Sequence, residues 1–148
     1  MTWFSRGASS LRALPNLAKG LHRAFGGRHE RGAQIQNALY GSEIADALAA
    51  LPEPFNAAVP GFLTDFLFGD FWTRDGLSVA TRELLGLVIL TAQGLTPQLT
   101  PHVRGAITAG NSVETVLAAL VQAFPYIGYP AAMNAIRVVL AYIESEES

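Results

Sequence analysis

The chain has no cysteine among its 148 residues. Without a thiol it forms no disulfide, holds no metal through thiolates and supports no thiol-dependent peroxidase cycle. This composition fits a reducing compartment, and we expect a cytoplasmic protein.

Charge is also scarce. Charged residues make up 15% of the chain, against roughly 25% in an average soluble domain. Half of the residues are hydrophobic. We therefore expect part of the surface to be covered by other subunits. The net charge of −2 predicts no general attraction to nucleic acid.

Long apolar runs and strand patterns are missing as well. The longest strongly apolar run, residues 84–92, is interrupted by Gly86 and falls short of the roughly 20 residues that span a bilayer. We expect no stable membrane insertion. No segment alternates apolar and polar residues as a strand does, so the sequence predicts an all-α domain of about six helices.

The first 29 residues differ from the rest. Six of the ten basic residues precede residue 32, and no acid precedes Glu30. Apolar residues at helical spacing predict a basic amphipathic helix over residues 9–25, closed by Gly26-Gly27. Three interpretations are open: a docking or membrane-surface helix, an import presequence, or a solvated extension. We favour an extension that docks on its own oligomer, followed by a domain over residues 30–148.

Helix signals recur through that domain. Ser42 and Ser78 are suited to cap helices, the second of which ends at Gly94. An aromatic-rich helix is predicted over residues 61–72. Asn111 and Glu114 are close to a capping box for the next helix, which we expect Pro125 to break. The last helix is predicted over residues 130–143.

Four segments occur in a characteristic order: FGDFWTRDGL (residues 68–77), TRELL (81–85), QLTPHVRGA (98–106) and YIGYPAA (126–132). Together they resemble the carboxymuconolactone decarboxylase family, within the alkylhydroperoxidase D-like superfamily. The resemblance implies an all-helical unit centred on a helical hairpin. It also implies assembly as a homotrimer or homohexamer, with pockets near the subunit contacts.

The resemblance implies that His102 is catalytic, because an imidazole titrates near neutrality and can transfer a proton. In the decarboxylase branch a glutamate stands four residues before this histidine, whereas this chain has Gln98. Glutamine donates and accepts hydrogen bonds but carries no proton as an acid. A helix beginning at Thr96-Pro97 would place Gln98 and His102 on one face. A helix beginning at Thr100-Pro101 would leave Gln98 in the preceding turn.

Substrate-binding candidates are two arginines and several aromatic residues. Arg74 is the preferred partner for a substrate carboxylate, because a guanidinium binds a carboxylate through two hydrogen bonds. Arg82 is the second candidate, although its position beside Glu83 at a helix start favours a structural role. An aromatic pocket is predicted from Phe68, Trp72 and Tyr126, although large aromatic residues are more often core. No histidine and carboxylate spacing predicts a metal site.

Two functions follow as expectations. The first is a cofactor-free lyase acting on an unsaturated lactone or related cyclic acid, with His102 as proton donor and Gln98 stabilising the developing oxyanion. The second is a catalytically silent subunit that binds a small ligand or serves in assembly. A His102 packed against apolar side chains would favour the second.

Overall fold

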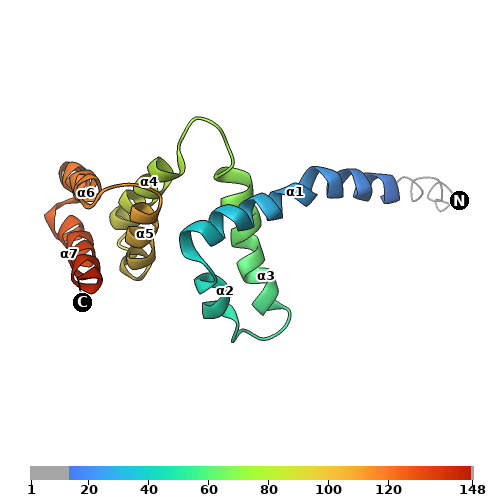
Figure 1. Ribbon diagram of the computed structural model, residues 1–148, viewed down its shortest axis with the longest axis horizontal. Coiled ribbons are helices and arrows are strands. Elements are labelled where there is room, and N and C mark those ends of the chain that lie inside the picture. Colours follow the sequence, from blue (N-terminus) through green and yellow to red (C-terminus); the bar gives the residue numbers. More distant parts are fainter. Residues whose placement is uncertain (1–13, 148) are drawn as a thin grey trace, which may run out of the picture.

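The computed structural model describes residues 14–147, with side chains from residue 27 onward. Every regular element of the described chain is a helix, as predicted (Figure 1). Its elements are α1 (Leu14–Tyr40), α2 (Glu43–Leu48), α3 (Phe55–Phe62), the π-helix η1 (Leu63–Phe71), α4 (Val79–Ala92), α5 (Thr96–Thr108), α6 (Val113–Ile127) and α7 (Tyr129–Glu146).

Two apolar clusters organise these helices. The first lies within α4–α7 and is centred on Leu87, Leu99, Val103, Leu120 and Val139, all 0–2% exposed. The second lies between the end of α1 and η1 and contains Leu39, Tyr40, Phe68 and Trp72. Burying a side chain of this size contributes about 1.5–3 kcal/mol.

Helix α1 crosses η1 where two glycines meet. A Cβ atom at Gly32 would lie 2.2 Å from the Thr64 carbonyl oxygen and 2.8 Å from the Gly69 nitrogen. A Cβ atom at Gly69 would lie 2.6 Å from the Arg28 carbonyl oxygen. The two backbones approach this closely because neither residue has a side chain.

Several predicted helix boundaries are confirmed. Ser78 caps α4, and its hydroxyl accepts a hydrogen bond from the Thr81 amide at 3.1 Å. Gly94 follows the end of α4 and has a φ of 71°, a conformation that favours glycine. The aromatic-rich helix predicted over residues 61–72 is formed by the end of α3 and by η1.

Three local predictions are wrong. Gly26-Gly27 does not end a helix, because α1 continues through both residues to Tyr40. Pro125 does not break α6, which runs on to Ile127 and ends at Gly128. The cap of α6 is Ser112 rather than Asn111, whose side chain instead donates to the carbonyls of Ala80 and Ala106. Residues 9–13 of the predicted basic helix lie outside the described residues.

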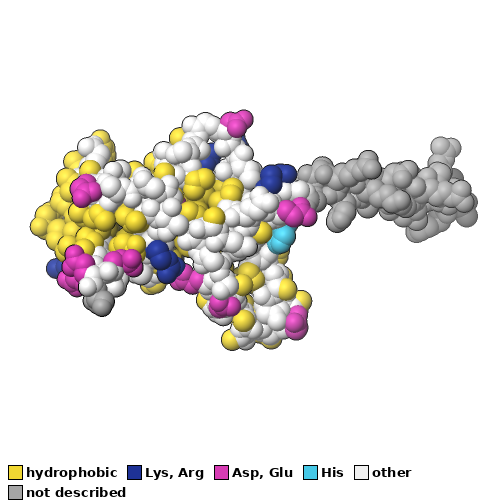
Figure 2. Space-filling view, in the orientation of Figure 1, with side chains coloured by type: hydrophobic (Ala, Val, Ile, Leu, Met, Phe, Trp, Pro, Cys, Tyr) yellow, Lys and Arg dark blue, Asp and Glu magenta, His cyan; other side chains and the backbone are white. Residues whose placement is uncertain are grey.

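Apolar side chains remain exposed on the single chain. Leu85 and Ile89 of α4 are 46% and 54% exposed. Figure 2 shows apolar side chains gathered at the end of the molecule formed by α6 and α7. Val121, Tyr129 and Leu140 are among the exposed residues of these two helices. No helix among the described residues has the length and apolarity needed to cross a bilayer.

The glycine crossing yields a stability prediction. Gly32→Ala forces the α1 and η1 backbones apart, and we expect it to lower the free energy of unfolding by about 2 kcal/mol, as overpacking typically does. Urea unfolding at one fixed protein concentration measures the effect. Gly61→Ala is the matched control: its Cβ meets nothing within 4 Å, so helix propensity should make it about 1 kcal/mol stabilising. Equal effects of the two substitutions would contradict the crossing as described.

Candidate functional site

Three polar side chains from separate helices meet where the two apolar clusters adjoin. Tyr40 ends α1, Glu83 lies in the first turns of α4, and His102 lies in the middle of α5. The Tyr40 hydroxyl donates to Glu83 Oε1. His102 Nδ1 lies 3.0 Å from Glu83 Oε2 and 3.2 Å from the Tyr40 hydroxyl. We call this group the Tyr40–Glu83–His102 cluster.

The carboxylate at its centre is completely buried, whereas the histidine ring is not. Glu83 has 0% exposure, and the His102 side chain is 24% exposed. A buried carboxylate is tolerated only with hydrogen-bond partners. Glu83 obtains them from Tyr40 and from the Nδ1–H of His102. That assignment leaves Nε2 as the ring nitrogen free to exchange a proton with a ligand.

Tyr40 acts in this cluster as a hydrogen-bond donor. Burial, then the neighbouring carboxylate of Glu83, raise the pKa of Tyr40 far above its usual value, and Arg104 opposes the shift. The phenol therefore stays protonated throughout the working range of an enzyme. It holds one carboxylate oxygen while His102 holds the other.

A glycine makes room for the cluster. A Cβ atom at Gly105, one turn after His102, would lie 2.7 Å from the Tyr40 hydroxyl and 3.0 Å from the carboxyl carbon of Glu83. The first distance is shorter than Cβ contacts in real structures, and the second is tighter than nearly all of them. An alanine at this position would displace the two partners on which His102 depends.

Helix α5 begins at Thr96 rather than at Thr100, so Gln98 belongs to the same helix as His102. Gln98 and His102 are four residues apart in one helix and lie on the same face. Gln98 is exposed, and no hydrogen bond joins it to His102 among the described residues. Pro101 lies inside the helix.

The aromatic candidates divide between core and surface. Phe68 and Trp72 are buried, and the Phe68 ring lies 5.9 Å from the Tyr40 ring. Phe68 therefore packs against Tyr40 within the core, and the Trp72 ring packs against Phe68, with 5.2 Å between the ring centres. Tyr126 is 81% exposed near the end of α6.

The arginine candidates both lie at the turn before α4. The Arg82 guanidinium donates to the carbonyls of Leu77 and Arg74, at 3.2 and 2.5 Å. It thereby holds the turn that leads into α4. The Arg74 guanidinium lies 6.0 Å from the centre of the Phe71 ring. Neither arginine is hydrogen-bonded to the cluster in the described part of the chain.

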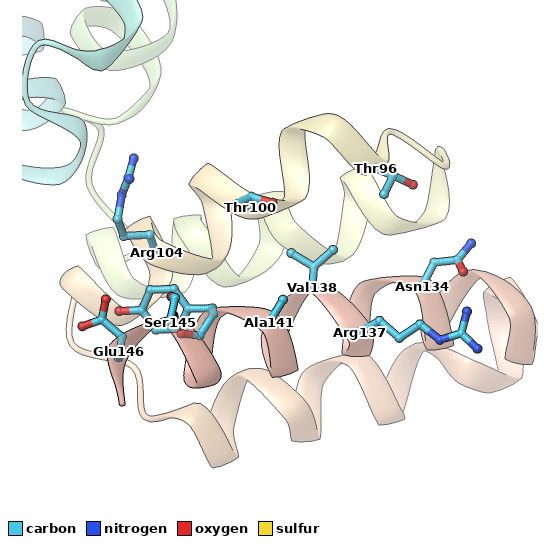
Figure 3. Close-up of a pocket in the computed structure, with 10 residues that line it drawn as sticks. Thr96, Thr100, Arg104, Asn134, Arg137, Val138, Ala141, Ser145 and Glu146 are labelled. Carbon is cyan, nitrogen blue, oxygen red and sulfur yellow. Dashed lines mark hydrogen bonds between the residues drawn. The ribbon is translucent and has the colours of Figure 1, made fainter. Parts of the chain in front are cut away.

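A cavity of about 680 Å³ lies between α5 and α7 (Figure 3). Thr96, Thr100 and Arg104 line it from α5, and Val138 and Ala141 line it from α7. Thr100 and Arg104 each stand two residues from His102, which corresponds to about 200° around an α-helix. The cavity therefore opens on the opposite side of α5 from the imidazole.

Glu83 and Tyr40 were missed as site residues in the sequence. One signal for Glu83 was present: Glu83, Leu87 and Thr91 recur every four residues on a mostly apolar helix, and all three are buried. A carboxylate on the buried face of a helix requires a partner. For Tyr40, 43 residues before Glu83, no local pattern indicated the contact. Among the side chains that the structure describes, those of residues 27–147, no group of three or more histidines and carboxylates is arranged to hold a metal ion.

Comparison with known proteins identifies relatives of this chain. The sequence model of the carboxymuconolactone decarboxylase family matches residues 57–141. A nitrosuccinic acid decarboxylase of Metarhizium robertsii is 29% identical over 80% of this chain and 80% of its own length. A 4-carboxymuconolactone decarboxylase of Acinetobacter baylyi is 24% identical over 75% of this chain and 83% of its own length. An uncharacterized 15.0 kDa protein of Paracoccus denitrificans is 32% identical over 60% of this chain and 69% of its own length.

The cluster predicts the tautomer of His102. With Glu83 accepting at Oε2, the neutral ring carries its proton on Nδ1. In Glu83→Gln the carbonyl oxygen accepts from Tyr40, so the amide NH₂ faces Nδ1 and the ring proton moves to Nε2. Nitrogen-15 NMR of histidine-labelled protein at alkaline pH distinguishes the two forms, with His102→Gln to assign the signal. An unchanged tautomer in Glu83→Gln would mean that Glu83 does not orient the ring.

Proposed function

Because the chain belongs to the carboxymuconolactone decarboxylase family, we propose that it is a lyase that removes CO₂ from a small carboxylic acid. His102 then protonates the carbanion that remains. The observation that carries the proposal is the hydrogen bond of 3.0 Å between the buried Glu83 and the Nδ1 atom of the partly exposed His102. This bond fixes the orientation of the ring and leaves Nε2 for the substrate.

The reaction balances with one protein acid. The bond between the carboxylate carbon and its neighbour breaks, and its electron pair moves into an electron-withdrawing group of the substrate. For this step His102 is the imidazolium, protonated on both ring nitrogens. Its Nε2–H donates to carbon, which leaves a neutral ring with its proton on Nδ1, and a proton from solvent then returns to Nε2. The electron sink belongs to the substrate, so we propose that no cofactor takes part. Gln98, on the His102 face of α5, is suited to donate to the oxygen that gains negative charge.

The substrate class follows from chemistry common to two relatives. Nitrosuccinic acid carries a nitro group on the carbon that bears a carboxylate. Carboxymuconolactone carries a carboxylate on an unsaturated lactone. In both, the electron pair left by CO₂ can be delocalised onto oxygen. We therefore propose a substrate whose carboxylate is attached to a carbon activated by a lactone, carbonyl or nitro group.

The alternative of a silent subunit has less support. It predicted a His102 packed against apolar side chains, whereas the ring contacts a carboxylate and a phenol and keeps 24% of its side-chain surface exposed. A buried carboxylate paired in this way contributes little net stability to the fold, so its presence favours a functional role for the cluster. A thiol peroxidase is excluded because the chain has no cysteine.

Assembly remains part of the proposal. The exposed Leu85 and Ile89 of α4 support a homo-oligomer, because exposed apolar side chains favour association with another subunit that covers them. A trimer or a hexamer is the state that we expect. Phe68 and Trp72 are proposed to hold Tyr40 in place rather than to contact substrate directly, while Arg74, Arg82 and Tyr126 remain proposed substrate contacts.

Turnover of γ-carboxymuconolactone and nitrosuccinic acid, followed as CO₂ release at neutral pH, tests the function. His102→Gln should lower kcat at least 100-fold, the usual scale for loss of a general acid. His29→Gln is the matched control: its ring is 60% exposed and bonded to Asp65 rather than to the cluster, so turnover should be unchanged. Equal activity in His102→Gln and the wild type would overturn the proposed role. No release of CO₂ from either acid by folded wild type would count against both substrates.

Tyr40→Phe tests the donor to the carboxylate. The variant keeps the ring but leaves Glu83 Oε1 without its hydroxyl partner, so His102 becomes less firmly oriented. We expect kcat to fall roughly tenfold, equivalent to about 1.4 kcal/mol, while KM changes little. Tyr142→Phe serves as control, because Tyr142 belongs to α7 and lines the cavity on the side of α5 that faces away from the cluster. A changed KM with an unchanged kcat would place Tyr40 in substrate binding instead of positioning.

A further inference from the structure

A stripe of exposed apolar side chains runs along α3 and into η1. Phe55, Val59, Phe62 and Phe66 are between 38% and 71% exposed. They follow one another at intervals of four, three and four residues, so they share one helix face. We call them the phenylalanine stripe. Exposed apolar stripes of this kind mark contact surfaces.

The first half of α1 carries a matching pattern in its sequence. Leu14, Ala18, Leu21 and Phe25 are also separated by four, three and four residues. Both patterns extend over eleven residue steps, or about 16 Å at 1.5 Å per residue. Two helices with apolar residues at these intervals pack side by side.

The two segments also carry opposite charge. Residues 1–31 hold six basic residues and one acid, whereas residues 32–73 hold five acids and no lysine, arginine or histidine. Asp46 is bonded to the Ser42 hydroxyl and Glu53 to the Asn56 amide. Neither acid is paired with a basic side chain within the described region. In Figure 2 the part formed by α2 and α3 shows acidic and apolar side chains but no lysine or arginine.

Geometry separates the two stripes within one chain. Helix α1 is continuous from Leu14 to Tyr40 and meets η1 at Gly32 and Gly69. Its first half continues past that crossing, away from α2 and α3 (Figure 1). A continuous helix does not fold back on itself, so residues 14–25 do not reach the phenylalanine stripe of their own chain.

We infer that residues 14–25 of one chain dock on the phenylalanine stripe of a second copy. The apolar residues of the basic helix cover Phe55, Val59, Phe62 and Phe66. Lys19 and Arg23 then lie near the acids of α2 and the α2–α3 loop. The exchanged helix ties neighbouring subunits together independently of the proposed catalysis.

Disulfide trapping tests this contact, and the absence of native cysteine makes it unambiguous. Leu21→Cys and Phe62→Cys are introduced into separate full-length chains, one of which carries a mass tag, and the two are co-expressed and oxidised. Both positions lie near the middle of their stripes, so either helix direction brings them within one turn. We expect a tagged–untagged disulfide dimer on a non-reducing gel. Its yield should fall when Arg23→Glu is added, because the charge attraction is reversed.

Val121→Cys in place of Phe62→Cys is the matched control, since Val121 is 53% exposed on α6, away from the stripe. The yield with Phe62→Cys should exceed that with Val121→Cys at least tenfold. Equal yields, or no mixed dimer in either pairing, would overturn the inference. The double variant on one chain provides a further test: a disulfide formed only within single chains would show that the helix docks on its own subunit.

Discussion

The Glu83 carboxylate has no exposure to solvent, and the arrangement of α1, α4 and α5 depends on how it is satisfied. An isolated buried carboxylate is strongly destabilising, and breaking a buried pair typically costs about 3–5 kcal/mol. Its two hydrogen-bond partners come from different helices, Tyr40 from the end of α1 and His102 from α5. The carboxylate thus specifies how the α1–η1 half meets the α4–α7 half. Gly105 is required at the same point because a side chain there would overlap both partners.

Much of the fold was predictable because its signals are local. The cap at Ser78, the turn at Gly94 and the aromatic spacing of residues 61–72 each depend on a few consecutive residues. The site was predictable only in part. His102 was a candidate from the sequence, but the side chains that it contacts lie 19 and 62 residues before it in the chain. The α4–α5 hairpin brings Glu83 to His102, and the packing of α1 brings Tyr40. Neither distance follows from helix periodicity.

Where local prediction failed, packing outweighed backbone preference. Glycine within a helix costs about 1 kcal/mol relative to alanine, yet α1 passes through Gly26 and Gly27. Beyond them, Gly32 allows contact with η1 that no other residue type permits. Pro125 removes a single hydrogen bond near the end of α6, while Leu120 and Ala123 of the same helix are buried. Pro101 likewise lies within α5, whose Leu99 and Val103 are core residues.

The distribution of positive charge suits the proposed reaction. No guanidinium is hydrogen-bonded to the Tyr40–Glu83–His102 cluster in the described part of the chain, and Arg104 is paired with Glu43. The proposed contacts of Arg74 and Arg82 are therefore expected at a substrate group other than the departing carboxylate. A cation bound to that carboxylate would stabilise the substrate more than the transition state, because CO₂ leaves without charge. An apolar surrounding has the opposite effect, since it raises the energy of the carboxylate relative to the delocalised anion. Catalysis then requires one oriented acid to protonate carbon. The buried carboxylate of Glu83 and the protonated phenol of Tyr40 provide that orientation for His102.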